Sequence, residues 1–205
     1  MIPKLLTFDI FGTVVDWRSG LLACVPSMSL EDFEEAIDRQ GALEKAAPGR
    51  RYSEIVAQDL EERGVPRERA AKIGSEVGKW PVFSDSREGM RRLMALAPCC
   101  AMTNSDRVHG EQVQAQLGFE LTHWIPAEEV KVYKPSPDFW RAVSRKLAIA
   151  PGKEWWHVSA YADYDLEVAR GLGLTTVFVA RPHSRRGRAD LEVRDLVELS
   201  QRLRA

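Results

Sequence analysis

Asp9 is the first residue of this chain whose position suggests chemistry. It follows the apolar run Leu5-Leu6-Thr7-Phe8, which is typical of a buried strand, and the chain then turns at Gly12-Thr13. In an open parallel sheet, ligands bind beyond the carboxyl ends of the strands, so an acid at this point is expected to face a binding site. The alternative is that Asp9 only caps the segment that follows it.

Three later segments also place polar side chains where a predicted strand ends or a helix is about to begin. They carry Thr103 with Asn104, Lys134, and Asp165. Each has an ordinary structural explanation, as turn residues, a solvated base or a helix cap. Because the carboxyl ends of parallel strands meet at one edge of a sheet, a shared site with Asp9 is the better interpretation.

The residue types of this set suit nucleophilic catalysis. An ionised Asp9 can attack an electrophilic carbon or phosphorus and form a covalent ester, which water then hydrolyses. An ammonium group within about 4 to 6 Å favours the carboxylate form, which is the role expected of Lys134. Thr13, Thr103 and Asn104 can aim the carboxylate or bind substrate oxygens through neutral hydrogen bonds.

The elements that must position these residues alternate between strand and helix. Strands are predicted at 99–102, 124–125, 155–159 and 175–179 in addition to the first one, which indicates an α/β fold with a parallel sheet. The chain between the first two strands shows only helical patterns, over 30–46, 53–63 and 67–77. We therefore expect a core domain formed by residues 1–13 and 81–205 and an inserted helical domain formed by residues 14–80.

The stretch Asp9-Ile10-Phe11-Gly12-Thr13 resembles the first motif of the haloacid dehalogenase superfamily, in which the nucleophilic aspartate is followed by a Gly-Thr pair. The resemblance extends in order through Thr103, Lys134 and Asp165. It implies a Rossmann-like parallel sheet with helices on both faces, and it identifies the helical insertion as the family's cap. It also implies that Asp165 orients or deprotonates the hydrolytic water.

Phe11 distinguishes two branches of that superfamily. Phosphatases have a second Asp two residues after the nucleophile, whereas the 2-haloacid dehalogenase branch has an aromatic residue there. Losing that general acid costs a phosphatase roughly 3 to 5 kcal/mol of barrier, but a halide leaves without a proton. Ala160 also replaces an acid that helps phosphatases to hold magnesium. We therefore expect no metal cofactor; if magnesium binds, Asp9 and Asp165 are its expected ligands.

The chain also departs from the dehalogenase pattern. Ala160 and Ala162 stand where well-studied members offer Ser and Asn, and Trp140 replaces a Tyr. The nearest candidate for the halide-binding Arg of the cap is Arg39, although Asp38 fits that place about as well. Phe11, Arg39, Thr103, Asn104 and Trp140 are the expected substrate-binding residues. A phosphatase acting on a small phosphate ester and a catalytically weak binding protein remain the alternatives.

Composition restricts the partners of the protein. The 205 residues carry 29 basic and 30 acidic side chains, so the net charge of −1 gives no general attraction to nucleic acid or membrane. The cluster Arg181, Arg185, Arg186 and Arg188 is interpreted as a solvated loop. Three cysteines without metal-ligand spacing and the absence of a signal-peptide pattern favour the cytoplasm. The expected partners are a small anionic substrate and, as the resemblance to a family whose members often dimerise implies, a second copy of the chain.

Overall fold

The computed structural model describes residues 2–47 and 49–204, and its centre is a six-stranded parallel sheet. The strand order is β3-β2-β1-β4-β5-β6, which confirms the predicted α/β class. The strands are β1 Leu5–Phe8, β2 Cys99–Thr103, β3 His123–Pro126, β4 Trp155–Ser159, β5 Thr175–Val179 and β6 Leu191–Val193. The short strand β6 was not predicted.

The central strands form because their side chains are buried on both faces of the sheet. Every residue of β1 and β2 is buried, which explains why these strands appear in the sequence as nearly continuous apolar runs. The chain moves from β1 outward to β2 and β3 and then returns to β4 on the other side of β1. This reversal beside β1 is the place where ligands bind in open α/β sheets, and Asp9 lies there.

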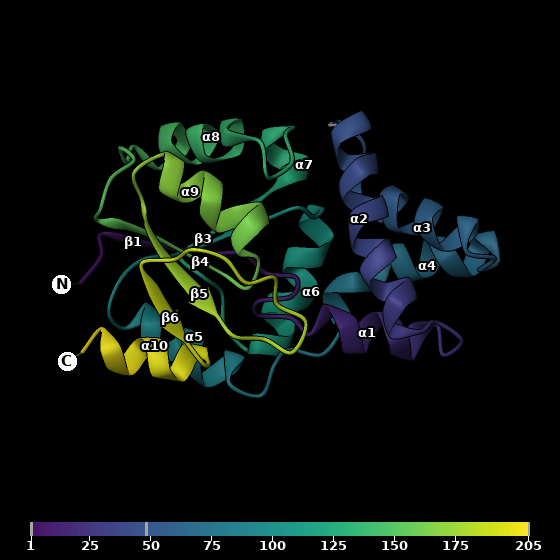
Figure 1. Cartoon of the computed structure of the whole chain (residues 1–205), viewed down its shortest axis with the longest axis horizontal. Helices are drawn as coiled ribbons and strands as arrows, with labels where there is room; N and C mark the ends of the chain where they lie inside the picture. The colour runs from purple at the N-terminus through teal and green to yellow at the C-terminus, as the bar shows by residue number, and fades with distance from the viewer. Residues whose placement is uncertain (1, 48, 205) are drawn as a thin grey trace.

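Helices cover both faces of the sheet, as expected. Figure 1 shows α8 and α9 on one face and α5 and α10 on the other. The core helices are α5 Ser86–Met94, α6 Arg107–Leu117, α7 Ala127–Val130, α8 Pro137–Leu147, α9 Glu167–Gly171 and α10 Leu196–Arg202. A π-helical turn, Ala162–Leu166, precedes α9 and carries Asp165.

Four helices between β1 and α5 lie beyond the carboxyl ends of the strands (Figure 1), and we call them the cap helices. They are α1 Trp17–Cys24, α2 Leu30–Ala46, α3 Tyr52–Glu62 and α4 Arg67–Glu76, followed by the 3₁₀ turn Val77–Lys79. The predicted helical ranges agree with α2, α3 and α4 within one residue at each end.

Hydrogen bonds from α6, and from Asp106 just before it, join α3 and α4 to the core. The start of α3 receives no side-chain cap from Arg51; instead, the carboxylate of Asp106 accepts hydrogen bonds from the backbone N–H groups of Tyr52 (2.8 Å) and Ser53 (3.1 Å). The His109 ring and the Gln112 side chain bind carbonyl oxygens of Gly74 and Ser75 at the end of α4. On this side, core side chains therefore bind the first N–H groups of α3 and carbonyl groups near the end of α4, which have no partner within their own helix. Within residues 2–47 and 49–204, no helix combines the length and apolarity needed to cross a membrane.

Candidate active site

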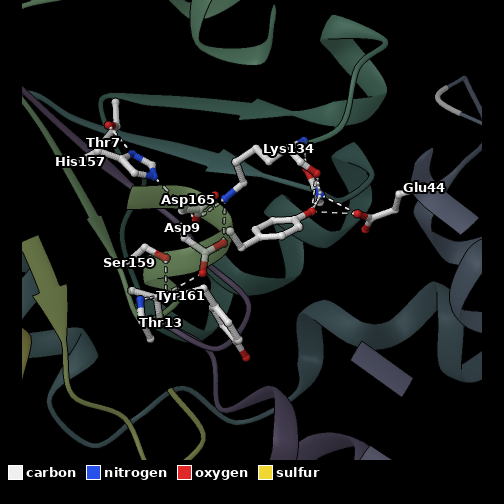
Figure 2. Close-up of polar contacts among 12 residues, drawn as sticks. Thr7, Asp9, Thr13, Glu44, Lys134, His157, Ser159, Tyr161 and Asp165 are labelled. Atoms are coloured by element: carbon white, nitrogen blue, oxygen red, sulfur yellow. Dashed lines mark hydrogen bonds and ion pairs between the residues drawn. The ribbon is translucent and has the colours of Figure 1, made fainter. Parts of the chain in front are cut away.

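Asp9 lies at the carboxyl end of β1, and its side chain is only 10% exposed. Thr13 Oγ1 donates a hydrogen bond to Asp9 Oδ2 over 2.7 Å, and Lys134 Nζ donates to Oδ1 over 2.9 Å. Between them, Gly12 has a φ of +94°, and a Cβ at this position would lie 2.5 Å from the ring of Tyr161. Glycine is therefore required at this turn both for its backbone conformation and for space. Figure 2 shows Asp9 between Thr13 and Lys134.

Lys134 lies between two carboxylates in the core of the site. Its side chain is 1% exposed, and Nζ lies 2.9 Å from Asp9 Oδ1 and 2.8 Å from Asp165 Oδ2. The Asn104 amide fixes the backbone of Lys134: Oδ1 accepts from Lys134 N over 2.8 Å, and Nδ2 donates to Lys134 O over 2.9 Å. Asn104 thus positions the lysine, a role in addition to the substrate contact expected from the sequence.

Burial and neighbouring charges shift the pKa values of Asp9, Lys134 and Asp165 in opposite directions. Burial raises the pKa of Asp9 above its ordinary value, and the nearby Lys134 offsets only part of that effect. Burial also acts to raise the pKa of Asp165, but Lys134 and His157 outweigh it and bring the pKa down to about 2. Burial acts to lower the pKa of Lys134, whereas the two carboxylates raise it above its ordinary value. At neutral pH, Lys134 is therefore an ammonium group.

Asp165 lies beneath the site rather than in its wall. Its side chain has no exposed surface, and its Oδ2 accepts from Lys134 and lies 3.6 Å from His157 Nε2. The other ring nitrogen of His157 is 2.8 Å from Thr7 Oγ1. The direct effect of Asp165 is to hold Lys134 in place through Oδ2, while its Oδ1 has no hydrogen-bond partner among the described residues. The contact with the hydrolytic water that the resemblance implies stays a prediction.

A cavity between the sheet edge and the cap helices opens above Asp9. Its wall is rich in aromatic side chains, contributed by Phe11, Trp17, Tyr52, Tyr161 and Tyr164. The face of α2 that lines it presents Ile37, Gln40, Gly41 and Glu44. Thr103 and Asn104 also reach the cavity, and Thr103 Oγ1 has no hydrogen-bond partner among the described residues. The oxygen itself is buried, so its expected bond to a substrate oxygen stays a prediction.

The structure does not bring two of the expected substrate-binding residues to this cavity. Arg39 points away and binds Glu62 through Nε (2.8 Å) and Nη2 (2.7 Å), because the cavity face of α2 is formed by residues 37, 40, 41 and 44. Trp140 is fully buried in the core and packs edge-on against the His157 ring, with 5.4 Å between ring centroids. Neither side chain lines the cavity.

The interpretation of the arginine cluster as a solvated loop was wrong for two of its members. Arg181 is 8% exposed and forms a two-pronged ion pair with Asp85, with bonds of 2.6 and 3.0 Å. Arg185 lines the cavity and binds Asp38 of α2 over 2.8 Å. Asp38, the alternative to Arg39, therefore pairs with a core residue at the edge of the cavity.

Glu44 is a cavity residue that was not predicted from the sequence. Its Oε2 accepts hydrogen bonds from Asn104 Nδ2 (2.8 Å) and from the Tyr164 hydroxyl (2.9 Å), and burial raises its pKa to about 8. Tyr164 was equally missed, although its place next to Asp165 was a usable signal. The helical spacing of α2 was a usable signal for Glu44 as well, because Glu44 continues the stripe of Phe33, Ile37 and Gln40, whereas the exposed acids of the helix lie off it.

The residues present do not fit a magnesium site. The two expected ligands, Asp9 and Asp165, both bind Lys134 Nζ, and Ala160 brings no carboxylate. Within the part of the chain that the structure describes, no group of three or more His, Cys, Asp and Glu is arranged to hold a metal ion. The carboxylate oxygens that would bind magnesium are thus not brought together at this site.

Comparisons with known proteins agree on one family. A family model described as haloacid dehalogenase-like hydrolase matches residues 3–173. Among solved structures, an L-2-haloacid dehalogenase is 26% identical with a TM-score of 0.84, and the match covers 98% of this chain and 99% of that one.

More distant structures show the same fold. The L-2-haloacid dehalogenase from Xanthobacter autotrophicus is 19% identical with a TM-score of 0.81, covering 100% of this chain and 99% of that one. A HAD-hydrolase from Bacillus subtilis bound to magnesium is 13% identical with a TM-score of 0.80, covering 100% of both chains. No curated protein sequence matches the chain.

Proposed function

The chain belongs to the haloacid dehalogenase-like hydrolases, and from this premise we propose that it hydrolyses the carbon–halogen bond of a small 2-haloalkanoic acid. Asp9 is the nucleophile of this reaction. Its carboxylate oxygen attacks C2 of the substrate and forms the aspartyl ester, while the halogen leaves with the bonding electrons as halide. Water then attacks the carboxyl carbon of the ester, releasing the 2-hydroxy acid, a proton and the free Asp9 carboxylate.

The observation that carries the proposal is the pairing of Asp9 with Lys134 beside the phenyl ring of Phe11. The lysine ammonium favours the ionised form of the nucleophile and offsets part of the rise in pKa that burial causes at Asp9. Phe11 lines the cavity and contributes an apolar wall against which a halogen or alkyl group can pack. It has no proton to give, which suits a halide leaving group and not an alkoxide. Thr13 supports the same carboxylate by a hydrogen bond, and Thr103 offers a free hydroxyl to the substrate.

The L-2-haloacid dehalogenase that is 26% identical over nearly the whole chain supports the same substrate class for this protein. The Xanthobacter autotrophicus enzyme has also been crystallised with chloropropionic acid covalently bound. That likeness, at 17% identity, concerns the fold, so the substrate has to be tested directly.

The test is incubation with 2-chloropropanoate in ¹⁸O-labelled water without added metal, followed by measurement of chloride and of label in Asp9. Because water attacks the ester at the carboxyl carbon, a single turnover is expected to place the label in Asp9 and leave the first product unlabelled. Label in the first product would refute the ester mechanism. Magnesium-dependent phosphate release from small phosphate esters, with no halide from any haloacid, would favour the phosphatase alternative. No turnover of either kind would favour a binding protein.

A further inference from the structure

Glu44 brings an acid group of the cap into the cavity that holds the nucleophile. Glu44 is 5% exposed, and Figure 2 shows it on the opposite side of the site from Asp9. Asn104 and Tyr164 both bind the same oxygen, Oε2. Among the described residues, no hydrogen bond reaches Oε1. One oxygen of Glu44 is therefore held by the core, and the other has no partner among the described residues, in a side chain that lines the cavity.

The charges around the cavity make an ionised Glu44 incompatible with an anionic substrate. The ammonium of Lys134 is shared between Asp9 and Asp165. The other cation that lines the cavity, Arg185, lies 2.8 Å from Asp38, 3.6 Å from Glu34 and 3.9 Å from Asp163. Each of these cations is thus already paired with at least two carboxylates. An anionic substrate in this cavity would be repelled by an ionised Glu44.

We propose that Glu44 binds the carboxylate of the substrate in its protonated form, donating a hydrogen bond from Oε1, and so selects anionic substrates only while it carries that proton. This inference rests on the proposed function, since it assumes an anionic haloacid. It gives the cap a specificity-determining residue in place of Arg39, which faces away from the cavity.

The surroundings of Glu44 agree with this assignment. Burial raises its pKa to about 8; the hydrogen bonds from Tyr164 and Asn104 and the charge of Lys134 oppose the rise, and the charge of Asp165 adds to it. Glu44 is therefore protonated at neutral pH and becomes ionised as the pH rises through about 8.

The other titratable groups facing Glu44 fall into two sets. The tyrosines around it, Tyr52 on α3, Tyr133 and Tyr164, all have a pKa raised above the ordinary value of 10.0 by burial, and the pKa of Lys134 is raised above 10.5. The pKa of Asp165 is lowered to about 2, whereas burial raises the pKa of Asp9 above 3.8. A change in anion binding between pH 7 and 9.5 therefore reports on Glu44 when it is absent from Glu44→Gln and present in Asp9→Asn.

The experiment is calorimetric titration with lactate, the unreactive hydroxy acid that 2-chloropropanoate would give, at pH 7 and pH 9.5. For a pKa of about 8, the wild-type protein is expected to lose about 30-fold in affinity at pH 9.5. Near pH 9, titrations in two buffers of different ionisation enthalpy should show the wild type taking up close to one proton per lactate bound. The variant Glu44→Gln keeps the shape and a hydrogen-bond donor, so its affinity should not change with pH and it should take up no proton. Glu54→Gln, at an exposed acid of α3, is the matched control and should behave as the wild type.

The results separate this inference from the proposed function. Proton-linked lactate binding without halide release would leave the role of Glu44 standing and refute the dehalogenase. Equal loss of affinity in Glu44→Gln and wild type, or no lactate binding at pH 7, would overturn the role of Glu44. If Glu44→Gln fails to fold, Asp9→Asn decides the question: it keeps Glu44 and removes the other carboxyl group of the cavity whose pKa is raised, so proton uptake that persists in it supports the role of Glu44 and its loss overturns that role.

Discussion

Replacing Lys134 with Met removes the ammonium that Asp9 and Asp165 share and leaves an apolar chain of similar length. Nζ donates to both carboxylates, at 2.9 and 2.8 Å, from a side chain that is 1% exposed. Breaking a buried ion pair by removing one partner costs roughly 3 to 5 kcal/mol. For a chain of this size, that loss lowers the melting temperature by roughly 6 to 20 °C.

The stability lost in Lys134→Met should be largest at neutral pH and become smaller as the pH falls. In the wild type, the pKa of Asp165 is lowered from 3.8 to about 2, so its contribution to stability is present above pH 3.8 and is lost as the pH falls through 2. In Lys134→Met, burial acts on both carboxyl groups without the lysine ammonium and raises their pKa, with only His157 still opposing the rise at Asp165. The folded variant then binds more protons than the unfolded chain, so its free energy of unfolding increases as the pH falls from 7.

Two measurements check this reasoning. Denaturant unfolding of both proteins at pH 7 and pH 4.5 should show a difference in stability that narrows on acidification. Halide release by Lys134→Met should be lost at pH 7, because Asp9 is then largely protonated, and should recover in part as the pH is raised. Lys146→Met is the control, since it removes an exposed lysine that binds Glu129 and should cost less than about 1 kcal/mol. A pH-independent stability difference, or normal turnover at pH 7, would refute the pairing.

Three further substitutions test other parts of the site. Asp9→Asn should abolish halide release while the circular dichroism spectrum stays that of the folded protein; near-normal turnover would remove Asp9 as nucleophile. Gly41→Ala should raise the melting temperature by roughly 2 to 4 °C, because Ala favours a helix interior by about 1 kcal/mol and a Cβ there meets nothing within 4 Å. The same methyl group enters the cavity, so turnover of 2-chlorobutanoate should fall relative to 2-chloropropanoate, and an unchanged ratio would exclude Gly41 from substrate selection. Arg185→Gln should loosen α2, seen as faster amide hydrogen exchange in that helix, since it removes the ion pairs to Asp38 and Glu34.

The sheet and the centre of the site could be predicted from the sequence because both depend on local patterns. Strands buried on both faces appear as apolar runs, and polar residues just past their ends identify the ligand-binding edge. Asp9, Thr13 and Lys134 were identified in this way, and the structure brings them within hydrogen-bond distance. Strand β6 was missed because it has three residues and only Val193 is buried.

The cavity wall depends on contacts between distant segments, which local patterns do not contain. The helical stripe of Phe33, Ile37 and Gln40 places Glu44 on the inner face of α2 and Arg39 off it, but the stripe alone does not say that this face meets a cavity above Asp9 rather than a packed core. Arg181 and Arg185 stand among loop residues of polar composition, and their acidic partners come from Asp85 and Asp38, about 100 residues or more away in the chain.

The hydrogen bonds of Asp106 have a consequence for how a substrate enters. Opening the cap on the α3 side would leave the first N–H groups of that helix without acceptors, because a core residue provides them. The α2 side is joined to the core through side chains, Arg185 with Asp38 and Glu44 with Asn104, which water can replace at less cost. The cap is therefore expected to swing about a pivot at Tyr52 and Ser53, so that the entrance widens beside α2. Spin labels across the α2 edge should then report larger and faster distance changes than labels across the α3 edge.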